Sequence, residues 1–101
     1  MPAVARGTKR DSVLTGHLCD TTTTTDVCST SVFVNNKGAC RKDDAISLHT
    51  IQVGNSCVDH TATITAGSST VFVDGFAIAR NGDAADSGTI SSGSDDVFAG
   101  G

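Results

Sequence analysis

The sequence predicts an all-β fold built from three short β-hairpins with pseudo-threefold symmetry, and three observations predict it. The first is composition: the 101 residues contain no glutamate, tryptophan or tyrosine, few leucines, and many threonines, valines, serines and glycines. Threonine and valine crowd a helix but suit a pleated strand. The second observation is the alternation of apolar residues in short segments, and the third is a phrase that occurs three times.

The repeated phrase consists of a small residue, a serine, two polar residues, a valine and a phenylalanine. It occurs as CSTSVF (28–33), GSSTVF (67–72) and GSDDVF (93–98). The first two copies continue in parallel through residues 32–45 and 71–84, each with an arginine followed three residues later by an aspartate. The opening PAVARGTKRDS resembles the second half of the same unit, with a spacing two residues longer. Joining the end of the chain to its beginning would complete a third unit, which predicts the pseudo-threefold arrangement.

Each unit predicts a hairpin followed by a connecting segment. SVFVNN and TVFVDG alternate valine and phenylalanine on opposite faces, and NNKG and DGF supply residues that tolerate positive φ in a tight turn. Between the hairpins we expect long polar loops over 11–27 and 43–64 and a short one over 83–90, with TTTTT (21–25) as an extended segment. The residues expected in the core or at the base of the molecule are Val32, Val34, Val71, Val73, Val97, Ile78 and Phe76.

Length and charge limit the organisation and the partners of the protein. A chain of this length predicts a single domain over residues 1–101. The net charge of −4 argues against nucleic-acid binding, because such proteins usually carry a basic face. The opening residues show no apolar run typical of a signal peptide, which predicts synthesis in the cytosol. Reduced thiols are the usual state there, and this weakens a disulfide interpretation of the four cysteines without abolishing it.

The three histidines predict a metal site. His17, His49 and His60 all lie in the two long loops, and equivalent loops of a repeat arranged about one axis would gather at one end. Imidazole nitrogen and thiolate sulfur are the ligands that tetrahedral zinc takes in proteins. Cys57 is the first choice for the fourth ligand, because it forms a C-x-x-H pair with His60, and Cys19, near His17, is the alternative.

The other two cysteines replace small residues of the repeat. Cys28 occupies the position of Gly67 and Gly93, and Cys40 that of Ala79, so we expect both to be small buried side chains. A Cys28–Cys40 or a Cys19–Cys57 disulfide is the less favoured alternative.

Catalysis is disfavoured by the residues near the histidines. A hydrolytic zinc site normally uses a nearby general base, often glutamate, and this chain has none. Asp59 is the only carboxylate beside the predicted ligands, and we expect it either to lie on the surface or to contact a ligand residue without binding the ion itself. A zinc hydrolase therefore ranks last among the function classes considered.

The order of these phrases resembles that of the PAAR-repeat proteins, the tips of the spikes of contractile phage tails and type VI secretion systems. The resemblance rests on AVAR near the start, TGH at 15–17, GACRKDDA, AIARNGDA and the repeated GSxxVF, and it covers nearly the whole chain; TGHLCDTTTT and CVDH are most similar to phage-borne members. It implies a small cone with a zinc ion near its apex, held by three histidines and one cysteine. Carried over by position, the histidines are His17, His49 and His60. The family's cysteine often precedes a glycine in the third unit, where this chain has Ser87, so the fourth ligand is open.

The resemblance also implies a function and a location. We expect a non-enzymatic, monomeric tip that caps a trimeric β-helical spike, one copy per trimer, and that helps to pierce a target membrane with which it makes transient contact. The location would be the virion tail tip, or the cytoplasm followed by type VI secretion. The residues that bind the spike are not identified by the sequence. The alternative is a small disulfide-stabilised β-rich binding module of a secreted or virion protein.

Overall fold

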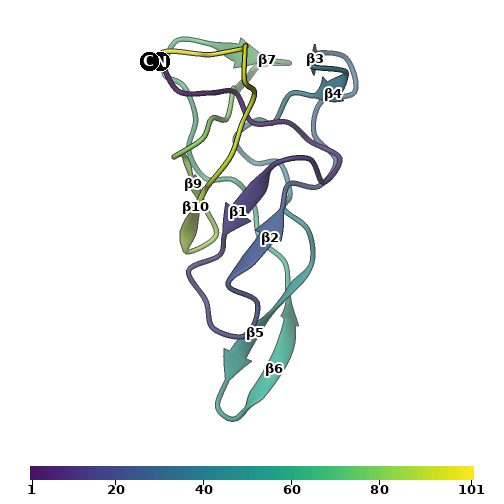
Figure 1. Ribbon diagram of the computed structural model, residues 1–101, viewed down its shortest axis with the longest axis vertical. Coiled ribbons are helices and arrows are strands. Elements are labelled where there is room, and N and C mark those ends of the chain that lie inside the picture. The colour runs from purple at the N-terminus through teal and green to yellow at the C-terminus, as the bar shows by residue number, and fades with distance from the viewer.

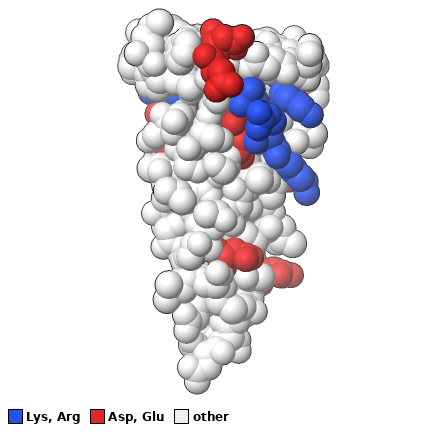
Figure 2. Space-filling model, viewed as in Figure 1, with Lys and Arg blue, Asp and Glu red and all other residues white.

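The computed structural model describes all residues from 1 to 101 and is all-β, as predicted. The molecule measures 42 × 24 × 23 Å and tapers from a wide end, where both termini lie, to a narrow one (Figures 1 and 2). It forms no helix, and hence none that is long and apolar enough to cross a membrane. The strands are β1 Ser12–Leu14, β2 Thr22–Thr24, β3 Phe33–Val34, β4 Lys37–Gly38, β5 His49–Val53, β6 Ser56–His60, β7 Phe72–Val73, β8 Phe76–Ala77, β9 Ala84–Ala85 and β10 Gly88–Ile90.

The first two predicted hairpins form at the wide end, as β3–β4 and β7–β8. Their turns, Asn35-Asn36 and Asp74-Gly75, have positive φ at both residues, which matches the twist of the flanking strands. The alternation is also confirmed, because the second valine of each VFV segment is buried while the phenylalanine before it is exposed. In the third unit the two chain ends take the place of the turn, and Ala3 pairs with Phe98.

Three equivalent backbone hydrogen bonds close a ring in the buried interior. The amide of Ala5 donates to the carbonyl of Ala79 at 3.0 Å, that of Ala79 to Cys40 at 2.8 Å, and that of Cys40 to Ala5 at 3.0 Å. These residues precede the arginines of the three units, and none of them is exposed to solvent. Small side chains are needed here because three strands of backbone approach one another closely.

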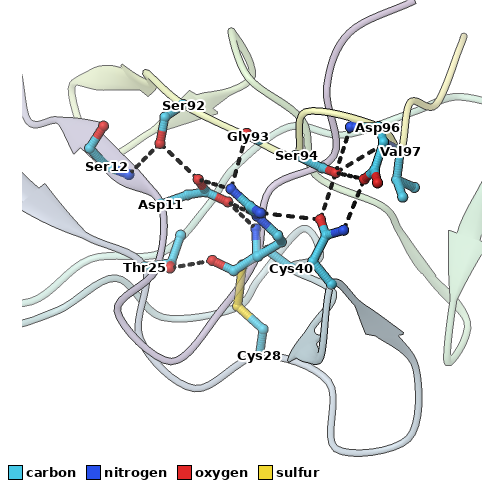
Figure 3. A network of polar contacts seen from close by, with 12 residues as sticks. Asp11, Ser12, Thr25, Cys28, Cys40, Ser92, Gly93, Ser94, Asp96 and Val97 are labelled. Carbon is cyan, nitrogen blue, oxygen red and sulfur yellow. Dashed lines mark hydrogen bonds and ion pairs between the residues drawn. A yellow bond between two sulfur atoms is a disulfide. The ribbon is translucent and has the colours of Figure 1, made fainter.

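Each unit contains the same arginine–aspartate pair, despite the longer spacing in the first one. Arg6 pairs with Asp11, Arg41 with Asp44 and Arg80 with Asp83. In all three, the arginine Nε and Nη2 contact the two carboxylate oxygens, and the aspartate also accepts the backbone amide of its arginine. Figure 3 shows that Ser92 also donates to Asp11, at 2.8 Å.

The serine of each repeated phrase ties its unit to the next one. The hydroxyl of Ser29 donates to Asp74, that of Ser68 to the carbonyl of Gly100, and that of Ser94 to Asn35. Each hydroxyl oxygen also accepts two backbone amides from its own phrase. The three contacts run in one direction around the molecule and return to the first unit.

The segments predicted as loops contain hairpins that were not predicted, although β2 confirms the extended conformation expected for residues 21–25. Strands β1 and β2 join β10 and β9 in a four-stranded sheet of order β2-β1-β10-β9, and β5–β6 forms the longest hairpin and the narrow end. Its turn is Gly54-Asn55, with Gly54 at φ 60°. A two-residue Gly-Asn turn between two short segments of strand-forming residues is a hairpin signal, so the prediction of a loop here was wrong for a recognisable reason.

Of the residues expected in the core or at the base, the structure buries Val34, Val73 and Ile78 and leaves the others exposed. Val34, Val73 and Ile78 belong to a cluster of six buried residues. A second cluster of nine, which includes Ile46, Ile64 and Ile90, lies among the connecting segments. The core is therefore two small clusters, and polar networks account for much of the rest of the interior.

Both disulfides that the sequence left as the less favoured alternative are present, and no cysteine is free. Cys28–Cys40 is buried and lies in the first unit, where the other two units have a glycine and an alanine (Figure 3). Both residues are small and buried as expected, but they are covalently joined. Cys19–Cys57 connects the segment after β1 to strand β6 and is exposed.

Candidate metal centre

The three histidines come together, and they do so around a carboxylate. His49 and His60 are the first residue of β5 and the last of β6, and they lie directly opposite each other in the hairpin. His17 comes from the segment after β1. Asp86 lies in the turn between β9 and β10. The ring centroids are 5.1 Å apart for the two pairs with His60 and 6.4 Å apart for the third pair.

All three Nε2 atoms point at the Asp86 carboxylate. Oδ1 lies 2.8 Å from Nε2 of His17 and 3.2 Å from Nε2 of His60. Oδ2 lies 2.8 Å from Nε2 of His49. The side chains of His49 and Asp86 are almost buried, while His17 and His60 are about a quarter exposed. Three imidazole rings and one carboxylate thus form a compact, partly buried cluster.

Local contacts hold the segment of His17 against the turn of Asp86. Thr15 Oγ1 donates to the Asp20 carbonyl at 2.7 Å and accepts the His17 amide at 3.1 Å, which folds the segment back on itself. Gly16 has φ 76°, and a Cβ there would collide with the backbone of Ser87. The glycine of the TGH phrase is therefore required both for its backbone conformation and for close approach.

The hydrogen bonds of His49 require either a proton or a cation between its Nε2 and the Asp86 carboxylate. Its Nδ1 lies 2.8 Å from the Ser47 carbonyl, which can only accept, so Nδ1 carries a hydrogen. In the neutral ring, Nε2 then has a lone pair that faces the lone pairs of Asp86 Oδ2. Two acceptors at that distance repel unless a proton or a metal ion lies between them. Fixing Nδ1–H on a carbonyl is also how metal-binding histidines are usually oriented.

The pKa of Asp86 reflects its contacts with the three imidazoles. Burial alone would raise its pKa, but the hydrogen bonds from His17, His49 and His60 outweigh that effect and lower the pKa of Asp86 below its ordinary value. The carboxylate is therefore ionised over the whole physiological range. An ionised carboxylate oxygen is one of the ligands that divalent ions bind in proteins.

The donor set fits a zinc ion. Zinc is bound by histidine nitrogen and carboxylate oxygen at about 2.0 to 2.2 Å, so tetrahedral ligand atoms lie about 3.3 Å apart. One ligand atom each of His17, His60 and Asp86 lies within 4.8 Å of the others, and His49 approaches the same carboxylate. The partly exposed rings of His17 and His60 have room to adjust around the nearly buried His49 and Asp86.

Neither cysteine proposed as the fourth ligand can serve in this structure, which corrects the prediction of Cys57 and its alternative Cys19. Their sulfur atoms are joined to each other. In addition, Cys57 and His60 lie three residues apart on strand β6, and residues at odd spacing on a strand point to opposite faces. A C-x-x-H pair converges only on a tight turn. Asp59 also points away from His60, as the residue next to it, and is exposed.

Asp86 is the ligand candidate that sequence reasoning missed. It directly precedes Ser87, the position at which the resemblance to PAAR-repeat proteins pointed to a cysteine, so attention to the neighbouring position would have found it. A carboxylate in the third of three equivalent connections, with the histidines in the other two, was the available signal.

The comparisons with known proteins agree with the resemblance found in the sequence. Residues 53–101 match the family model of the PAAR motif. The matched segment contains His60 and Asp86. It also contains the whole of the second and third repeated phrases and strands β6 to β10. No curated protein matches the chain.

Proposed function

Residues 53–101 of this chain belong to the PAAR-motif family, and from that premise we propose that the protein is a spike tip of a contractile injection machine. It caps a trimeric β-helical spike, one copy per trimer, in a phage tail or a type VI secretion system. Its three hairpin units form a cone with pseudo-threefold symmetry, and its role is mechanical rather than enzymatic. The observation that carries the proposal is that three equivalent units face the wide end while their connections meet in one His/Asp cluster.

The wide end supplies the docking surface in this proposal. Each repeated phrase exposes a valine and a phenylalanine there, and the exposed fractions of the phenylalanines are 60% for Phe33, 59% for Phe72 and 48% for Phe98. Large apolar side chains exposed in a repeated pattern indicate a protein partner. Three nearly equivalent patches are suited to a partner with three identical subunits.

The cluster supplies the second element, a zinc ion held by His17, His49, His60 and Asp86. A bound ion would tie the three connections to one another at a second point, beyond their shared apolar cluster, and metal binding adds directly to folding free energy. A domain of this size has little core to spare, so such a staple adds rigidity where the molecule narrows. The site has no unengaged carboxylate to act as a general base, which supports a structural ion.

The narrow end supports a transient contact with a membrane. Val53 and Val58, in the β5–β6 hairpin that forms this end, are exposed. On the face shown in Figure 2, the basic side chains lie in the wide half of the molecule, acidic side chains lie lower down, and the extreme tip carries neither. Uncharged, aliphatic surface costs less to remove from water than a charged surface does.

Two measurements test the proposal. Elemental analysis of the purified protein should find one zinc per chain. Native mass spectrometry of the protein mixed with trimeric β-helical spikes from contractile tails should find one chain per spike trimer. A metal-free chain that captures no spike from any such machine would refute it.

A second function, a small disulfide-stabilised binding module, is favoured by one observation, the two disulfides. From the sequence alone, disulfides and a metal ion are alternatives, because both would use the cysteines. In the structure the four candidate ligands include no cysteine. The two disulfides and a metal ion can therefore exist in one molecule. Zinc content and spike capture therefore discriminate the two functions, whereas a thiol count does not.

A further inference from the structure

The two disulfides differ in what surrounds them. Cys28 and Cys40 are 4% and 0% exposed and belong to the core cluster of Ile46, Ile64 and Ile90. Cys19 and Cys57 are both exposed, near the narrow end. Thiol–disulfide exchange requires a thiolate to reach a sulfur atom, so its rate depends on access. The buried bond can be reached only after the core opens, whereas the exposed one can be reached in the folded protein.

The exposed disulfide is also one of the few attachments of the narrow hairpin. Strands β5 and β6 form a sheet of their own and pair with no other strand. Apart from the histidine cluster, the hairpin is held by the segment around Cys19, through the pairing of Cys19 with Ile51. Next to it, the Asp20 amide donates to the Thr50 carbonyl, and the Asp20 carboxylate accepts from the Thr50 amide and hydroxyl.

An isolated two-stranded hairpin is at best marginally stable in water. The hydrogen bonds of Asp20 and Thr50 are exposed, so water competes with them and their net contribution is modest. The covalent bond is the one attachment on that side that water does not weaken. Opening it should therefore loosen the hairpin without unfolding the two core clusters, which lie on the other side of the histidines.

We propose that Cys19–Cys57 is a site of thiol–disulfide exchange that clasps the β5–β6 hairpin and can be opened and closed in the folded protein. The reaction partner is a dithiol, either a small molecule or a dithiol oxidoreductase. One thiolate of the partner attacks a sulfur of the clasp, which releases one cysteine and forms a mixed disulfide with the other. The partner's second thiolate then attacks its own sulfur in the mixed disulfide and releases the second cysteine. The Cys19–Cys57 bond breaks, one disulfide forms in the partner, and two electrons with two protons pass to the cysteines. In a reducing compartment the clasp is open, and in an oxidising one it closes.

The test is a timed reduction of the whole protein with dithiothreitol in native buffer, quenched by an alkylating reagent and mapped by peptide mass spectrometry. Cys19 and Cys57 should become labelled at least about a hundredfold faster than Cys28 and Cys40, because the latter require the core to open. Hydrogen exchange of the selectively reduced protein should rise in residues 49–60 and stay unchanged in the segments of the core clusters.

Two double variants serve as matched controls. Cys19→Ser/Cys57→Ser should show the raised exchange in 49–60 without reductant and should not respond to it. Cys28→Gly/Cys40→Ala introduces the residue types of the equivalent positions in the other units, and its hairpin should exchange and respond as in the unaltered protein. Labelling of all four cysteines together, labelling of Cys28 and Cys40 first, or unchanged exchange in 49–60 after selective reduction would each overturn the proposal.

Discussion

Asp86 Oδ2 lies 2.8 Å from Nε2 of His49, and the other ring nitrogen, Nδ1, donates a hydrogen bond to the Ser47 carbonyl. The pair explains how a chain without a free thiolate can offer a four-ligand site. A carboxylate is a harder ligand than a thiolate, so the site should rely on charge and on the fixed orientation of His49 for its affinity. That dependence makes the contribution of each ligand measurable.

Replacement of Asp86 by asparagine should lower zinc affinity by at least about 100-fold, since loss of a group that only supports a ligand already costs 10- to 100-fold. The amide keeps the shape of the side chain but removes its charge. Competition with a chromophoric chelator measures the affinity. Asp59→Asn is the control, because this exposed carboxylate of the same hairpin points to the other face. Equal affinities in the two variants would show that Asp86 is not a ligand.

Replacement of His49 by alanine should lower the melting temperature sharply and make it insensitive to chelators. The unaltered protein should melt at a lower temperature after metal removal, because metal binding and folding are coupled. The measurement is thermal unfolding with and without a chelator, together with zinc content. His49→Ala with unchanged melting and unchanged zinc would contradict the assignment, and so would an unaltered protein whose melting ignores the chelator.

The repeated units could be predicted from the sequence because their signals are local. Val34 and Val73 follow a period of two, and the turns after them carry residues that accept positive φ. The same reasoning applied to Gly54-Asn55 would have found the β5–β6 hairpin, and the prediction of a loop there was an omission of a local signal. These parts of the fold follow from the residues that form them.

The ligand set could be predicted only in part, because it depends on which side chains meet in space. The convergence of His17, His49 and His60 followed from the repeat. The choice of Cys57 failed because a spacing rule for tight turns was applied to a residue that lies on a strand. The pairing of Cys19 with Cys57 links residues far apart in sequence, and no local pattern specifies it.

The buried Arg6–Asp11 pair predicts acid sensitivity. Burial alone would raise the pKa of Asp11, but hydrogen bonds from Arg6, Ser92 and the Arg6 amide lower it below its ordinary value of 3.8. A carboxyl group whose pKa is lower in the folded than in the unfolded protein contributes stability above the unfolded pKa. That contribution is lost as pH falls through the folded value. Stability should therefore decline as pH drops below the ordinary value.

Asp11→Asn isolates that contribution. At neutral pH the variant should be less stable by about 3 to 5 kcal/mol, because it leaves the buried Arg6 charge unpaired. Denaturant unfolding at a series of pH values measures the difference from the unaltered protein. The difference should be constant near neutrality and should narrow in strong acid. A difference that stays the same down to about pH 2 would contradict the role of Asp11 in acid sensitivity.

Cys28→Gly/Cys40→Ala tests how much the buried disulfide adds to the free energy of unfolding. The other two units have no disulfide at the equivalent positions. The half-cystines are 12 residues apart in sequence, and closing a loop of this size contributes about 2 to 3 kcal/mol. The variant should keep its fold by circular dichroism and lose that amount in denaturant unfolding. An unfolded variant would show that the first unit, unlike the other two, depends on its covalent bond.

The repeated phenylalanines predict a graded loss of spike binding. Phe33→Ser, Phe72→Ser and Phe98→Ser each remove one exposed aromatic ring from an equivalent position at the wide end. Because these rings are exposed, the isolated protein should keep its stability. If each ring is buried against one subunit of a trimer, each variant should weaken binding by about 2 kcal/mol or more, as aromatic anchors at interfaces do. Isothermal titration with the trimeric spike that the unaltered protein binds measures the loss. Val53→Ser, at the narrow end, is the matched control and should bind normally. Binding that weakens in Val53→Ser but not in the phenylalanine variants would place the interface at the opposite end of the molecule.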